Sequence, residues 1–345
     1  MQTDRNEVID FLRFLGLSLI ILAHLYPPPW LFQLRNFDVP LMVLVSGLTH
    51  SLQPKKLNPI DFVAKRVKRL VYPAWTFLTL YFLCLTMFEL KFDKLTFANV
   101  FHSYTFISGI GFVWIFRVFI ITSALAPLVD RFNKKLRSNN TYLIILLCCF
   151  LSYEFLLLIE WKVILGAKHY LYFSSIVFYG IFYTLIFSLG TRLLSFNLNQ
   201  ICYVLISAIL LFIGYAFYFL HITGSIPATQ HFKYPPQLYY LSYSLMLCII
   251  CYLISPTAHK VIASWPTLNL LIRFISRNSL WIYFYHIIFI KINIKEQIPN
   301  LLLSYAFIYT ASVICCFLQL SMVSKSLLLF SGNRTKQYIR LMFTG

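Results

Sequence analysis

Residues 10–24 read DFLRFLGLSLIILAH, an apolar run interrupted by three ionisable side chains, those of Asp10, Arg13 and His24. At about 100° per residue, the eleven positions from Arg13 to His24 return to within roughly 20° of one direction on a helix, about 16 Å further along its axis. Asp10 lies three residues before Arg13, on nearly the same face, and can pair with it. We therefore predict a helix with one polar stripe, which has an ion pair at one end and an imidazole at the other.

Spacing alone leaves two interpretations of this stripe open. In the first, Asp10 and Arg13 anchor the helix at a membrane interface and His24 lies near the outer headgroups. In the second, the stripe lines a cavity, because ionisable groups within a bilayer normally face the protein interior or water. An imidazole in a cavity can act as a general base, since it exchanges a proton near neutral pH.

Composition indicates a membrane protein. Hydrophobic residues make up 59% of the 345 positions and charged residues 12%, whereas soluble domains carry about 25% charged residues. Apolar segments of about twenty residues, the length that crosses a bilayer, recur along the chain. We predict an all-α polytopic bundle forming a single membrane domain over residues 1–345, with no separate soluble domain. Ten transmembrane helices are expected, at about 7–26, 38–53, 71–89, 111–129, 141–159, 171–190, 201–220, 237–254, 278–295 and 300–323.

The basic residues predict the orientation of these helices. If the N-terminus is cytoplasmic, the inner segments hold 19 Lys and Arg residues and the outer segments hold 8, a bias that places both termini in the cytoplasm. The net charge of +18 is spread between apolar segments, which predicts contact with membrane lipids and no nucleic-acid partner. The eight Cys residues lie mostly within apolar runs without metal-ligand spacing, so no metal is expected. The residue usage favours a bacterial cytoplasmic (inner) membrane.

Four segments together resemble the integral membrane acyltransferase-3 family. The D-x-x-R…His pattern of residues 10–24 opens the chain, and VPLMVLVSGLTHS (39–51) is similar to the family's second-helix segment. KRVKRLVYPAW (65–75) is similar to the family's Arg-x-x-Arg stretch, with Arg66 and Arg69 in the matching positions. NSLWIYFYH (278–286) resembles a late Ser-Leu-Gly-Ile-Tyr…His segment, with Trp281 in place of the usual Gly.

This resemblance implies a membrane acyltransferase with an acyl-CoA donor and His24 as the catalytic residue. Arg13 is then expected to orient the donor, and Arg66 and Arg69 to bind its phosphates, because guanidinium groups bind phosphate bidentately. On charge alone, the favoured interpretation of Arg66 and Arg69 is a positively charged membrane anchor that contacts lipid phosphates. His286 is a secondary candidate, which the substitution at position 281 weakens.

Further ionisable residues are candidates for a role beside His24. Asp38 can fix the tautomer of His24 across a short hairpin, or it can act as an N-cap of the second helix. Glu154 is another possible partner, and Arg117 interrupts an apolar helix in GFVWIFRVFI (111–120). Lys233 and Tyr234 lie in the longest outer loop, which is either a Pro-stopped loop or an acceptor-facing segment.

The function expected from these residues is transfer of acetyl from acetyl-CoA to a hydroxyl of a cell-surface polysaccharide or its lipid-linked precursor. His24 acts either as a general base or as the group that carries the acetyl. The alternative is a transporter or exporter of a glycan or lipid, although such proteins often contain paired broken helices that this sequence lacks. Ser46 in VSGL is interpreted as a helix-packing residue rather than a nucleophile.

Overall fold

A computed structural model describes residues 7–53, 58–90, 93–292 and 294–344, and within these ranges the regular structure is helical, without strands. The elements are α1 (Glu7–Ala23), α2 (Pro29–Leu34), α3 (Asp38–Ser51), α4 (Pro59–Met87), α5 (Phe97–Tyr104), α6 (Trp114–Lys135), α7 (Asn139–Leu157), α8 (Trp161–Phe173), η1 (Ser174–Phe178), α9 (Tyr179–Leu193), α10 (Leu198–Thr223), η2 (Thr229–Phe232), α11 (Leu238–Ala263), α12 (Pro266–Arg277), α13 (Ser279–Lys291), α14 (Ile294–Gln297), α15 (Leu301–Leu329) and α16 (Asn333–Thr344). The all-α prediction is confirmed.

Six segments in the described part of the chain are long and apolar enough to cross a membrane: α4, α7, the continuous stretch Trp161–Leu193, α10, α11 and α15. The other predicted crossings coincide with α1, α3, α6 and α13, which are shorter or more charged. Ten crossings and cytoplasmic termini therefore stay predictions. Of the basic residues counted for the orientation, Arg5, Lys55, Lys56 and Lys91 lie outside the described residues.

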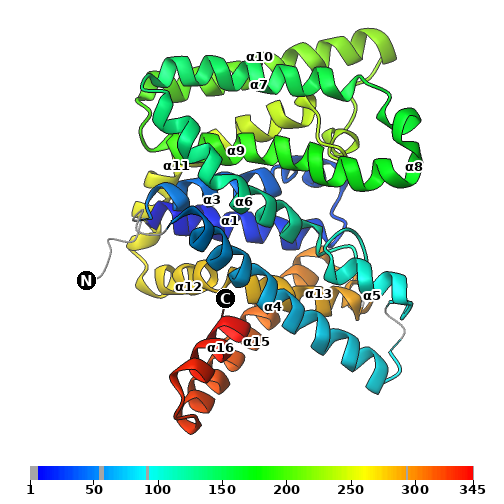
Figure 1. Ribbon diagram of the computed structural model, residues 1–345, viewed down its shortest axis with the longest axis vertical. Coiled ribbons are helices and arrows are strands. Elements are labelled where there is room, and N and C mark those ends of the chain that lie inside the picture. The colour runs from blue at the N-terminus through cyan, green and yellow to red at the C-terminus, as the bar shows by residue number, and fades with distance from the viewer. Residues whose placement is uncertain (1–6, 54–57, 91–92, 293, 345) are drawn as a thin grey trace.

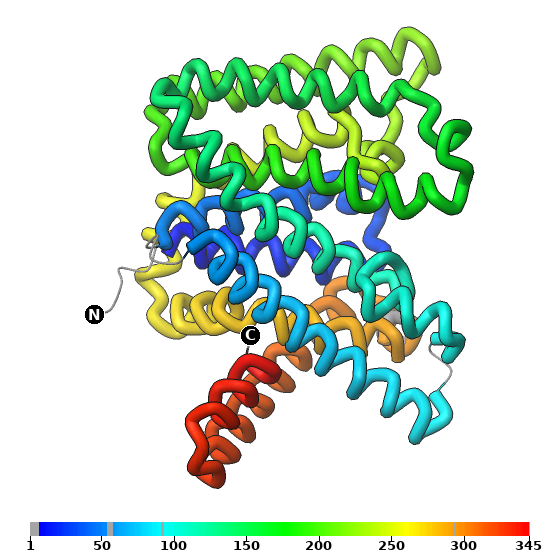
Figure 2. Tube along the Cα trace, in the orientation of Figure 1, coloured from blue at the N-terminus to red at the C-terminus, as the bar shows by residue number. Residues whose placement is uncertain are grey.

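The helices lie side by side in a layered bundle, with α7 and α10 at one end and α15 and α16 at the other (Figure 1). Helix α1, which carries the polar stripe, and its neighbour α3 lie in the middle of this stack. Figure 2 shows the C-terminal helix α16 returning toward α4, against which it packs. Because α1 lies in the centre of the bundle, much of its surface is buried against other helices. Side chains of its polar stripe are therefore expected to contact neighbouring helices.

A pair of glycines allows α3 to cross α9 closely. A Cβ added at Gly47 would lie 2.3 Å from the Phe187 carbonyl oxygen, and one at Gly190 would lie 2.3 Å from that of Leu44. Both distances are shorter than any real carbon–oxygen contact, so each position requires glycine. Close backbone approach through small residues is typical of membrane helix pairs. The VSGL segment therefore does serve helix packing, through Gly47.

Helix α4 begins at Pro59, twelve residues before the predicted start at 71. Pro59 suits the first helical turn, and the Asn58 side chain caps the helix by accepting a hydrogen bond from the Asp61 backbone N–H at 2.8 Å. The basic stretch 65–69 is consequently helical rather than a loop. The basic side chains Lys65, Arg66, Lys68 and Arg69 therefore project from α4 at helical spacing.

Candidate functional site

One end of the polar stripe on α1 is fixed by hydrogen bonds to α3 and α12. The Arg13 guanidinium donates to the Thr49 hydroxyl at 2.8 Å and lies 3.9 Å from the Asp10 carboxylate. Ser276, at the end of α12, donates to Asp10 at 2.8 Å and is 3.4 Å from Arg13. The predicted Asp10–Arg13 pair is thus present, and two hydroxyl groups hold it in a single orientation.

A cavity of about 390 Å³ opens beside this pair. Its polar lining includes the guanidinium groups of Arg13, Arg66, Arg69 and Arg277, with Thr49, Ser46 and Gln53. The Arg66 Nε atom is buried and has no hydrogen-bond partner within the described ranges. Apolar side chains of α1, α6 and α13 line the rest of the cavity, including Ile20 and Phe116. The structure therefore brings together the three arginines that the sequence singled out at this end; we call this group, with Arg277, the arginine end.

The other end of the stripe holds a pair of imidazoles, which we call the histidine end. His24 follows directly after α1, and its Nδ1 lies 3.0 Å from the Nε2 of His286 on α13. The Nδ1 of His286 contacts the backbone carbonyl of Tyr283 one turn earlier. The Phe112 ring packs on His24, with ring centroids 4.7 Å apart. His286 is fully buried, whereas His24 is partly exposed.

These contacts determine which ring nitrogen of His24 can accept a proton. A carbonyl oxygen only accepts hydrogen bonds, so the Nδ1 of His286 carries its proton. In a neutral ring the Nε2 of His286 is then an acceptor, and the Nδ1 of His24 must donate to it. The Nε2 of His24 is left with a free lone pair. This arrangement prepares His24 to take a proton from a hydroxyl group placed against its Nε2.

The cavity and the imidazole pair meet at Tyr283. The Tyr283 side chain lines the cavity, its ring centroid is 4.8 Å from that of His286, and its hydroxyl donates to the Phe112 carbonyl at 2.6 Å. Tyr283 thus contacts both the arginine-lined cavity and the imidazole pair.

Asp38 is engaged differently from the expectation that it meets His24. Its carboxylate accepts from Arg35 at 2.7 Å and from Lys233 at 3.1 Å, and all three side chains are buried. It is also not an N-cap: Phe37 takes that position, and Asp38 is the first residue of α3, where it accepts from its neighbour Val39 at 2.8 Å. Two buried cations need a carboxylate more than a neutral imidazole does, which explains this pairing.

Glu154 and Arg117 contribute to the packing of the bundle. The Glu154 carboxylate accepts from the backbone N–H of Leu238 at 3.0 Å, so it caps the start of α11 from α7. The Arg117 guanidinium donates to the Ile107 carbonyl at 3.0 Å and lies over the Tyr179 ring. Arg117 forms no ion pair with a carboxylate within the described ranges.

Lys233 and Tyr234 have different environments although they are neighbours. Lys233 is buried and also donates to the Asn36 side chain at 3.3 Å. Tyr234 is 50% exposed, and its ring lies against those of Trp114 and Tyr179, with centroids 5.6 and 6.4 Å away. Lys233 therefore holds the loop to α3, and Tyr234 presents an aromatic face at the surface.

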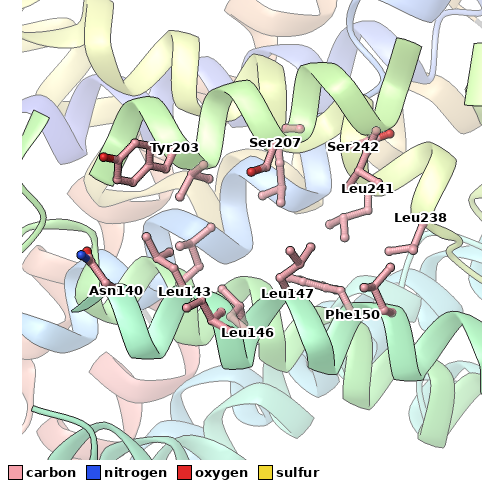
Figure 3. Close-up of a pocket in the computed structure, with 17 residues that line it drawn as sticks. Asn140, Leu143, Leu146, Leu147, Phe150, Tyr203, Ser207, Leu238, Leu241 and Ser242 are labelled. Atoms are coloured by element: carbon pink, nitrogen blue, oxygen red, sulfur yellow. The ribbon is translucent and has the colours of Figure 1, made fainter. Parts of the chain in front are cut away.

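A second cavity, of about 380 Å³, lies between α7, α10 and α11 (Figure 3). Its lining is dominated by leucines such as Leu143, Leu147 and Leu241, and includes no carboxylate, imidazole or basic side chain. Such a lining suits hydrocarbon and offers no acid–base chemistry. No cluster of metal-ligand type was found among the described residues, so nothing there contradicts the expectation of no metal.

Sequence reasoning missed three residues at the arginine end, Thr49, Ser276 and Arg277, and the Tyr283 carbonyl at the histidine end. Arg277 immediately precedes the quoted segment 278–286, which was the available signal. Thr49, Ser276 and the Tyr283 carbonyl have no such signal in a single sequence. A hydroxyl or carbonyl group acquires its role from the side chains that the fold places within hydrogen-bond distance of it.

Comparison with known proteins identifies a family to which the chain is similar. No curated protein and no solved structure matched the chain. The family model described as an acyltransferase domain, that of the acyltransferase-3 family, matches residues 6–320. This match runs from α1 into α15 and includes both ends of the polar stripe. The chain is a multi-pass membrane protein that belongs to the acyltransferase-3 family.

Proposed function

We propose that this protein transfers acetyl from acetyl-CoA to a hydroxyl of a cell-surface polysaccharide, or of its lipid-linked precursor, at the bacterial inner membrane. The observation that carries the proposal is the hydrogen-bond chain from the Tyr283 carbonyl through His286 to His24. A general base must be held within reach of its substrate with an unprotonated nitrogen facing it. The Nε2 of His24 is unprotonated in this arrangement, as a base must be. The partial exposure of His24 supports access of a substrate to that nitrogen.

The arginine end supports a phosphorylated donor. Coenzyme A carries several phosphate charges, and the cavity collects Arg13, Arg66 and Arg69 around about 390 Å³. Arg66 is suited to this role because its buried Nε has no partner in the described part of the protein and is therefore free to donate to a ligand. In this proposal Arg66 and Arg69 bind the donor's phosphates, and Arg13, fixed by Thr49, orients its arm toward His24.

The proposed reaction begins when the acceptor hydroxyl attacks the thioester carbonyl while the Nε2 of His24 takes the hydroxyl proton. The carbon–sulfur bond then breaks, and the coenzyme A thiolate takes the proton back from His24. The products are an acetyl ester and free coenzyme A. In the alternative, His24 Nε2 itself attacks the thioester, and the acetyl passes from the imidazole to the hydroxyl.

The test measures acetyl transfer directly. Cells lacking the protein are complemented with the wild-type chain, and the masses of their surface glycans are compared, together with incorporation of radiolabel from acetyl-CoA by isolated membranes. We expect the acetyl mass and the incorporation to depend on the protein. An exporter would instead change the amount of surface glycan without any dependence on acetyl-CoA, and that result would refute the proposal.

A further inference from the structure

A second polar cleft adjoins the arginine-lined cavity, between α4 and the C-terminal helix α16. It has a volume of about 640 Å³, and its lining includes Lys65, Lys68, Gln337 and Arg340. Arg69 and Thr344 line both the cleft and the cavity beside Arg13. The two spaces are therefore neighbours and share a guanidinium group.

The charge in this cleft is strongly one-sided. Four cations line it, from Lys65, Lys68, Arg69 and Arg340, against one carboxylate, that of Asp61. In the part of the chain that the structure describes, these four cations form no ion pair with a carboxylate. Positions 61, 65, 68 and 69 recur at helical spacing along α4 and so share one face. Such a concentration of positive charge favours a ligand with several negative charges.

Helix α16 is fixed in place as the second wall of the cleft. The Phe343 ring stacks on that of Trp281, with centroids 6.1 Å apart and an interplanar angle of 13°. The Gln319 side chain donates to the Phe343 carbonyl at 2.6 Å. Trp281 stands where the resembling family segment has glycine, and α16 lies beyond the matched residues 6–320. This chain thus uses its tryptophan to hold a wall that the family model does not include.

We propose that the α4–α16 cleft binds the 3′-phosphoadenosine of coenzyme A, while the adjoining cavity takes its diphosphate, held by Arg66 and Arg69, and its pantetheine arm. This inference rests on the proposed function. The cleft holds Lys and Arg groups, which bind phosphate as point charges and as bidentate forks. Arg69, which lines both spaces, lies where the 3′-phosphoadenosine joins the diphosphate.

The experiment compares two variants of the full chain in a neutral detergent without anionic lipid. The cleft variant is Lys68→Gln/Arg340→Gln. The matched control is Arg334→Gln/Lys336→Gln. It also removes two cations, both from α16 and both outside the cleft lining. The probe is fluorescent 3′,5′-ADP, and the thermal melting of each variant is recorded to verify folding.

We expect the Kd for 3′,5′-ADP to rise about tenfold or more in the cleft variant, as for the loss of a charge-assisted hydrogen bond. The control should bind it like the wild type. The KM for acetyl-CoA should rise in parallel, while transfer from S-acetylpantetheine, which has no phosphate, should stay unchanged. Wild-type nucleotide affinity in a folded cleft variant, or no binding by the wild type, overturns the proposal.

Phosphate groups of lipids provide the competing occupant. If the cleft variant loses bound phosphatidylglycerol in native mass spectrometry but keeps its affinity for 3′,5′-ADP, the cations hold headgroups and the proposal is wrong. Failure of the proposed function has a different signature, since the wild type would then transfer no acetyl from acetyl-CoA. The 3′,5′-ADP measurements would still decide whether the cleft binds a nucleotide.

Discussion

The two ends of the polar stripe on α1 are built in opposite ways. At the histidine end, His286 is fully buried and Asp38 and Lys233 are 3% exposed, and each of them has protein partners at hydrogen-bond distance. At the arginine end, cavities of about 390 and 640 Å³ adjoin, and the cations Lys65, Lys68 and Arg69 are exposed. A reacting nitrogen needs a fixed tautomer and position, whereas a large polyanion needs room and unpaired positive charge. The difference fits the proposed division, with the base at one end and donor binding at the other.

The largest effect is expected from replacing the proposed base. His24→Ala should lower kcat about 10²- to 10⁴-fold, the usual contribution of a positioned general base, and leave the Kd of acetyl-CoA unchanged because the arginine end is intact. Acetyl incorporation and donor binding are measured on the same detergent-purified sample. Normal incorporation would remove His24 from the reaction and break the division between the two ends.

The second effect concerns stability at the histidine end. Asp38→Asn leaves Arg35 and Lys233 buried without their counter-charge, which should destabilise the protein by about 3–5 kcal/mol. Thermal unfolding in detergent measures the loss. The control is Asp93→Asn, whose carboxylate pairs with Lys291 at 2.7 Å in a less buried place and should cost less. Equal Tm values for both variants would show that the buried Asp38 carboxylate stabilises the fold no more than the less buried Asp93–Lys291 pair does.

The third effect belongs to the arginine end. Arg66→Ala removes a guanidinium that lines the cavity, so the Kd of acetyl-CoA should rise about tenfold or more, since hydrogen bonds to charged groups contribute about 1.5–3 kcal/mol. The rate at saturating donor should change little. Isothermal titration gives the first quantity and label transfer the second. If donor affinity survives in an Arg66→Ala/Arg69→Ala double variant, these residues serve only as a membrane anchor.

The smallest effect tests how His24 is oriented. His286→Phe removes the acceptor of the His24 Nδ1 proton, and kcat should fall about tenfold, because one orienting hydrogen bond is worth on the order of 1.5 kcal/mol. The KM for acetyl-CoA should not move, which separates a positioning role from a general loss of structure. An unchanged kcat would show that His24 needs no partner to set its tautomer.

The sequence predicted the helical class and the Asp10–Arg13 pair, which follow from local periodicity and helical spacing. The family resemblance pointed to Arg66 and Arg69, and the structure places both around one cavity with Arg13. The sequence did not predict that the Asp38 carboxylate would pair with Arg35 and Lys233. Lys233 lies almost two hundred residues from Asp38 in the sequence. Whether its ammonium group contacts the Asp38 carboxylate therefore depends on how α3 and the 229–236 segment pack together.

By itself, then, the sequence determined that this is a membrane chain with a guanidinium on its first helix and an imidazole close to the end of that helix. Only the tertiary structure decided that His286, 262 positions later, would orient His24, and that Trp281 would hold α16 beside α4. The physical reason is that spacing fixes direction on one helix, whereas contacts between helices depend on which side chains fit at each crossing. Gly47 and Gly190 show this dependence most directly, because neither sequence position reveals that the other must also be small.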